Sequence, residues 1–124
     1  MSKPKPYNSG QWTQARMNSF VKSALRGARW PVKYECIKSA YTGKSAPNPA
    51  TGRLCKQYRC ADCMRSFPQK HVRADHIKPV VDPVRGFVDW NTYVERLFVE
   101  LDGFQCLCKE CHDAKTARER KARK

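Results

Sequence analysis

The sequence has no long hydrophobic stretch and no apolar N-terminal segment. Its apolar runs, such as Leu97-Phe98-Val99, are only a few residues long, whereas a membrane-spanning helix needs about 20 apolar residues. The first six residues include two lysines and two prolines and no apolar core, so we expect no secretory signal. These absences predict no contact with a membrane and a cytoplasmic location.

Acidic residues are also scarce. Among 124 residues, Lys and Arg number 25 and Asp and Glu 11, which gives a formal net charge of +14. This excess predicts a polyanionic partner such as nucleic acid, and the alternative is a merely soluble basic protein. The length suits one domain. With 40% hydrophobic residues, interrupted by eight prolines and six glycines, the core is thin and needs a covalent or metal staple.

Seven cysteines supply material for such a staple. An odd number without a secretory signal argues against a disulfide framework. Two C-x-x-C pairs, Cys60–Cys63 and Cys108–Cys111, match the four-thiolate set that structural zinc prefers. The alternative is a pair of reactive or redox thiols. The three further cysteines are expected to be small buried apolar residues: Cys36, Cys55 and Cys106. Cys55 or Cys106 could replace a zinc ligand, but only by breaking one of the two pairs.

The N-terminal half reads as mainly helical. Residues 1–10 form a flexible basic N-terminus, and residues 11–55 form a helical extension. Apolar spacing predicts a helix over 11–28, and Pro31 suits the first turn of a second. Residues 43–52, which contain two prolines, are expected to form a loop. The first helix carries a basic stripe, expected on its outer face: Lys22, Arg26 and Arg29.

Residues 56–124 combine short strands with helices, so the chain is a small α+β protein. Residues 56–67 read as a strand, a tight cysteine turn and a return strand, and 72–81 as a strand that enters a loop. Apolar residues at helical spacing predict a core-facing helix over 90–101 with Asp89 as its N-cap. A last helix starts near Lys109 and runs into a basic tail.

Three motifs occur in a suggestive order. Cys60–Cys63 is followed by Asp75-His76-Ile77-Lys78-Pro79 and then by Cys108-Lys109-Glu110-Cys111-His112-Asp113-Ala114-Lys115. The pattern C-x-x-C, D-H-x-x-P, C-x-x-C-H-x-x-K resembles the HNH endonucleases, most of all the short HNH proteins of tailed phages. The resemblance covers about half of the chain, roughly residues 57–119.

The resemblance implies a ββα-metal core, stapled by a zinc site of four cysteines, with the N-terminal helices packed on it. It implies that His76 is the general base and that Asp75 and His112 ligate a catalytic divalent cation, either Mg²⁺, Mn²⁺ or another metal. Phosphodiester hydrolysis needs an activated water and charge stabilisation at the leaving oxygen. The implied activity is metal-dependent cleavage or nicking of DNA in the cytoplasm of a phage's host cell, with 5′-phosphate and 3′-hydroxyl products.

Two features bear on this interpretation. Gly103 stands where the family has an Asn that ties the catalytic loop, and Asn91 is a nearby candidate to replace it. In a regular strand Asp75 and His76 face opposite sides. They can flank one phosphate only if the strand ends there and the chain bends, as Pro79 suggests. The alternative is a structural His76 with Asp75 as a surface neighbour.

Basic residues near these motifs are candidates for contacts with DNA phosphates. Lys115 shares a helix face with His112. The full set comprises Lys115, Arg118, Arg73 and Lys78 around the motifs and Lys22, Arg26 and Arg29 in the first helix. Contacts with phosphates do not distinguish one base sequence from another. For each residue taken singly, the alternative is an ordinary surface charge in contact with water. The rival functions are a non-catalytic zinc-containing DNA-binding protein and an accessory to phage packaging or replication proteins.

Overall fold

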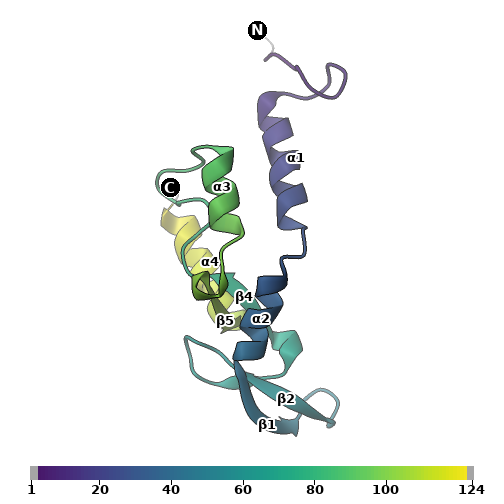
Figure 1. Ribbon diagram of the computed structural model, residues 1–124, viewed down its shortest axis with the longest axis vertical. Helices are drawn as coiled ribbons and strands as arrows, with labels where there is room; N and C mark the ends of the chain where they lie inside the picture. Colours follow the sequence, from purple (N-terminus) through teal and green to yellow (C-terminus); the bar gives the residue numbers. More distant parts are fainter. Residues whose placement is uncertain (1–2, 123–124) are drawn as a thin grey trace.

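The computed structural model describes residues 3–122, so the first two and last two residues of the expected N-terminus and tail lie outside it. Within that range four α-helices accompany two antiparallel sheets, which confirms a small α+β fold. None of the helices in the described range is long and apolar enough to cross a bilayer. The molecule is elongated, with α1 toward one end and the β1–β2 hairpin at the other (Figure 1).

Two helices form early in the chain, as predicted. α1 spans Gln14–Arg26, and its N-cap Thr13 accepts a hydrogen bond from the Arg16 backbone N–H at 3.2 Å. It begins three residues later than expected because Tyr7 and Trp12 form a β-bridge. α2 spans Pro31–Ser39 and buries Cys36 and Ile37, whereas α1 has no buried residue.

The basic stripe of α1 lies only partly on an outer face. Lys22 Nζ lies 4.7 Å from the centre of the Phe87 ring, and Arg26 Nε donates a hydrogen bond to Tyr93 Oη at 3.0 Å. The aliphatic stems of both cations cover aromatic surface. Lys22 is half-buried against Phe87, so the outer-face prediction was wrong for this residue, whereas Arg26 and Arg29 stay exposed.

A strand occupies much of the region expected to be a loop. β1 spans Tyr41–Pro47 and pairs antiparallel with β2, Leu54–Arg59. It tolerates glycine and proline because it is an edge strand: Gly43 adopts φ 81° beside a register irregularity, and Pro47 is the last residue. β2 also pairs with β3, Ser66–Phe67, across the cysteine turn, which confirms the predicted strand–turn–strand unit.

The second sheet holds the motif residues. β4, Val72–His76, pairs antiparallel with β5, Phe104–Cys108, from Val72↔Cys108 to His76↔Phe104. The expected strand over 72–81 is shorter and stops at His76, and β5 was not predicted. α4, Lys109–Ala122, follows β5 directly, as expected. Figure 1 shows α2 and α4 beside this two-stranded sheet, and both contact β4 and β5.

α3 spans Trp90–Leu97 and is capped by Asp89, whose carboxylate accepts from the Thr92 N–H at 2.7 Å. The cap is confirmed, but the predicted end at residue 101 was wrong. Backbone carbonyls at and beyond the helix end bond to other parts of the chain: Leu97 O to His76 and Val99 O to the Trp30 indole, each at 2.7 Å. Tertiary hydrogen bonds thus replace the continuation of the helix.

The buried side chains form three clusters. The first lies between α2 and the two sheets and includes Ile37, Tyr58 and Phe104. The second surrounds Cys60, Leu107 and Cys108. The third joins Val80 to Tyr93 and Leu97 of α3, and Leu25 of α1 packs against it. No cluster is large, as expected for a short polar chain.

Candidate metal centre and active site

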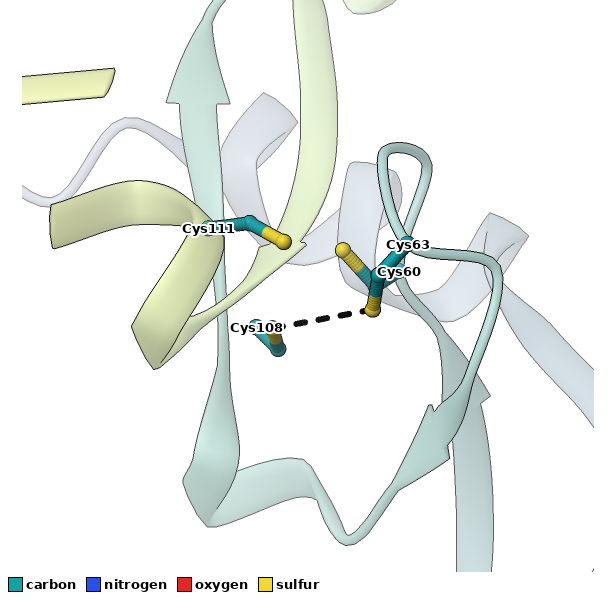
Figure 2. Close-up of side chains that lie close together, drawn as sticks. All are labelled: Cys60, Cys63, Cys108 and Cys111. Atoms are coloured by element: carbon teal, nitrogen blue, oxygen red, sulfur yellow. Dashed lines mark hydrogen bonds between the residues drawn. The ribbon is translucent and has the colours of Figure 1, made fainter. Parts of the chain in front are cut away.

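Four sulfur atoms converge at the junction of the two sheets. Cys60 and Cys63 come from the turn after β2, Cys108 ends β5, and Cys111 lies in the first turn of α4; their Sγ atoms all lie within 4.8 Å of one another (Figure 2). Cys63 Sγ and Cys108 Sγ are 3.9 Å apart. Zn–S bonds of about 2.3 Å in a tetrahedron give sulfur separations of about 3.8 Å. The four-cysteine cluster is therefore confirmed as a candidate zinc site.

The backbone around the cluster favours the thiolate form of Cys60. Burial raises the pKa of the Cys60 thiol, but backbone N–H groups of Cys108, Cys63 and Asp62 outweigh burial and lower this pKa to about 6. The Asp62 N–H donates to Cys60 Sγ at 3.4 Å. Burial and hydrogen bonds from neighbouring sulfurs raise the pKa of Cys111. Four sulfurs at these distances become thiolates together only around a cation.

The remaining cysteines lie outside the cluster. Cys36 and Cys106 are buried in the first core cluster. Burial raises the pKa of Cys36 and raises that of Cys106 to about 11, so both stay neutral thiols at pH 7. Cys55 is half-buried in β2, with its Sγ 3.6 Å from Ala46 O. Their expected role as small apolar residues fits this placement.

The side chains of Asp75 and His76 point to opposite faces of β4. Val72 and Ala74, which share the alternation of His76, pack in the first core cluster. Asp75 instead contacts Lys115 and His112 of α4. The strand ends at His76, and the chain bends at residues 77 and 78. The bend therefore follows the pair, and within the strand the two side chains keep their contacts on opposite faces.

Asp75 is the centre of a polar cluster on the α4 side. Its carboxylate is 12% exposed, and Oδ2 accepts from Lys115 Nζ at 2.6 Å and from Gln105 Nε2 at 3.1 Å. Its other oxygen, Oδ1, lies 3.8 Å from His112 Nε2. Gln105 was missed by the sequence reasoning; it is the β5 residue paired with Asp75 and shares its face.

Asp75 and His112 lie close together without a direct hydrogen bond. The 3.8 Å between Oδ1 and Nε2 is too long for a hydrogen bond, yet both atoms can reach one ion at about 2.1 Å. The second ring nitrogen, Nδ1, is buried without a hydrogen-bond partner, and Asp113 Oδ1 lies 3.7 Å from it. Among the residues the structure describes, the four cysteines form the one group of three or more metal-ligating side chains, and Asp75 with His112 offers two donors.

His76 is held by the end of α3. Its Nε2 lies 2.7 Å from Leu97 O, and its ring centre is 4.7 Å from that of Phe104. A carbonyl can only accept, so Nε2 carries the proton and Nδ1 keeps a free lone pair. Burial lowers the pKa of His76, and the charges of Lys33 and Arg26 lower it further, against the Leu97 hydrogen bond. The ring is therefore a neutral imidazole with one accepting nitrogen.

Gly103 is required by close packing. A Cβ there would lie 2.6 Å from Val99 Cγ2 and 2.7 Å from Val99 Cβ, so the family's Asn does not fit this backbone. Gly103 O accepts from the Ile77 N–H at 3.0 Å. Backbone contacts thus tie the segment after His76, while Asn91 is exposed in the first turn of α3. The Leu97 carbonyl, and not Asn91, orients His76.

Replacement of Gly103 by alanine should destabilise the fold. The added methyl group collides with the Val99 side chain, and the backbone of Val99 is fixed by the hydrogen bond from the Trp30 indole to its carbonyl. Such overpacking costs about 1–3 kcal/mol. Urea unfolding measures the change. Gly27→Ala is the matched control, because its Cβ would meet its nearest neighbour, Ser23 O, at 3.4 Å. Equal stability of the two variants would contradict the steric account.

The other basic candidates are spread over the surface. Arg118 and Lys115 line a groove on the α4 side together with Ala61, Asp62, Gln105, Leu107 and Cys111. Arg73 is exposed in β4 and shares the face of Asp75. Lys78 borders a different groove that also contains Glu95, Glu100 and Asp102, a setting less suited to phosphate. Arg29 is exposed between α1 and α2.

Comparison of the chain with protein-family models, with curated proteins and with solved structures found no match.

Proposed function

We propose that this chain is a metal-dependent HNH endonuclease, of the kind that phages encode, which hydrolyses phosphodiester bonds of DNA. The observation that carries the proposal is the pair at the end of β4. One residue, His76, has a neutral ring with a free Nδ1, and its neighbour Asp75 lies beside His112 of α4. The order β4, β5, α4 supports a ββα-metal core. A binding module has no use for this trio.

The residues have distinct roles in the reaction. His76 Nδ1 takes a proton from the attacking water, whose oxygen forms a bond to phosphorus while the bond to the 3′ oxygen breaks. A divalent cation such as Mg²⁺ or Mn²⁺, bound by Asp75 and His112, would supply charge stabilisation at the phosphate and leaving oxygen. Leu97 O fixes the His76 tautomer, and Gln105 orients Asp75. The products carry a 5′-phosphate and a 3′-hydroxyl.

The net charge of +14 supports DNA as the substrate. Arg118 and Arg73 are exposed near the Asp75 face, and we expect them to contact the DNA backbone next to the cleaved bond. Lys22 and Arg26 lie beside Phe87 and Tyr93 and could contact a second stretch of backbone. Contacts of this kind position a duplex without reading its sequence, so we propose no sequence specificity.

Supercoiled plasmid tests the proposal directly. The zinc-loaded protein should convert plasmid to nicked or linear forms with Mg²⁺ or Mn²⁺, and Asp75→Asn should abolish the conversion because it removes the anionic ligand. Gel electrophoresis of time courses provides the measurement. Asp102→Asn, an exposed carboxylate of the other groove, is the control and should cleave normally. Cleavage by Asp75→Asn at the wild-type rate would refute the assignment.

The alternative is a zinc-containing DNA-binding or phage packaging and replication accessory protein without catalysis. One observation favours it: Lys115 already pairs with the Asp75 carboxylate at 2.6 Å, which competes with a metal. Retention of plasmid in gel-shift experiments, with no cleavage in any divalent metal, would select this function over the nuclease.

A further inference from the structure

The Lys115 ammonium is enclosed by oxygen acceptors. Nζ lies 2.6 Å from Asp75 Oδ2 and 3.4 Å from Glu119 Oε1, and it also donates to the backbone carbonyl of His76. The side chain is only 18% exposed. Most lysines extend into water. Lys115 instead pairs with Asp75, the carboxylate that also faces His112.

We propose that Lys115 is an internal counter-cation, which weakens divalent-metal binding in the free protein and turns to a DNA phosphate when substrate arrives. The inference rests on the proposed function, because it concerns the same Asp75 carboxylate. A divalent ion at Oδ1 would place two further positive charges within a few ångströms of Nζ, and such charges repel strongly in a partly buried site. A bound phosphate relieves that repulsion.

This arrangement makes metal and DNA binding cooperative. If a phosphate draws Lys115 away from Asp75, DNA strengthens metal binding, and by linkage the metal strengthens DNA binding to the same extent. The groove shared by Lys115 and Arg118 provides the adjacent position for a phosphate. Free protein would then hold little divalent metal, and the assembled site would form on substrate.

Replacement of Lys115 by methionine tests the proposal without cleavage. Methionine keeps the length of the side chain and removes the charge and the donor. We expect the zinc-loaded Lys115→Met protein, without DNA, to bind Mn²⁺ roughly tenfold more tightly than wild type. Electron paramagnetic resonance of free Mn²⁺ measures this. Lys121→Met, an exposed lysine of the same helix, controls for net charge and should bind Mn²⁺ as wild type does.

Unchanged Mn²⁺ affinity in Lys115→Met, or a gain matched by Lys121→Met, would overturn the inference. Lys115→Gln provides the same comparison if the methionine variant does not fold, as judged by circular dichroism and zinc content. The gain should disappear in Lys115→Met/His112→Ala, which places the ion at the Asp75 site. If Lys115→Met binds Mn²⁺ more tightly but the wild-type protein does not cut plasmid, the counter-cation role stands and the nuclease proposal fails. If the wild-type protein cuts plasmid but the two proteins bind Mn²⁺ equally, the nuclease proposal stands and the counter-cation role fails.

Discussion

His76→Ala should lower the rate of plasmid cleavage by roughly 10²–10⁴-fold, the usual contribution of a positioned general base. The substitution removes Nδ1, the one accepting nitrogen of the ring, together with the Nε2–H group that donates a hydrogen bond to the Leu97 carbonyl. Zinc content should stay the same, because the four sulfurs come from other elements. Cleavage rates at saturating Mg²⁺ or Mn²⁺ provide the measurement.

His71→Ala is the matched control for this experiment. His71 ends a short 3-10 turn before β4 and is exposed, so its loss should leave both cleavage and stability unchanged. If His76→Ala cleaves as fast as His71→Ala, His76 has no part in proton transfer. A loss of cleavage accompanied by a loss of cooperative unfolding would instead assign it a structural role in the packing against Phe104.

Local patterns were sufficient to predict the parts of the site that depend on spacing. Two C-x-x-C pairs predicted the sulfur cluster, because two residues between cysteines bring both sulfurs to one ion. Helical spacing and Asp89 predicted the start of α3. The sequence interpretation needs Asp75 and His76 to flank one phosphate, whereas both lie in β4, where the alternation of a strand gives them contacts on opposite faces.

Features that depend on tertiary contacts could not be read locally. β5 is a five-residue segment whose strand conformation comes from pairing with β4, about 30 residues earlier. β1 looked like a loop because its glycine and proline break regular patterns, which an edge strand tolerates. The end of α3 is set by hydrogen bonds to His76 and Trp30, and no spacing signals those partners.

The pairing of Lys115 with Asp75 is a similar case. Sequence spacing placed Lys115 on the face of His112 and suggested a phosphate contact. The structure keeps that face but shows the ammonium on the carboxylate. Attraction between the two charges in a partly buried site favours this conformation. A sequence pattern does not show whether Lys115 pairs with Asp75 or with a DNA phosphate.

Cys108→Ser should lower zinc content and thermal stability together, and chelation should do the same in wild type. Structural zinc contributes about 10–16 kcal/mol in small zinc domains, whereas a whole domain is stable by only about 5–15 kcal/mol. The small core clusters of this chain cannot replace a contribution of that size. Loss of the metal should therefore abolish cooperative unfolding, as measured by calorimetry alongside zinc analysis.

Cys55→Ser separates the metal from the general loss of a thiol. Cys55 is half-buried in β2 and lies outside the sulfur cluster, so its replacement should leave one zinc per chain and the melting temperature near that of wild type. Cys108 is the last residue of β5, directly before α4, and is 2% exposed. Loss of its sulfur should therefore loosen the packing of α4, which carries His112, against β4, which carries Asp75. A normal melting curve in the zinc-free protein would mean that packing alone holds these elements together, and the metal would then have no structural role.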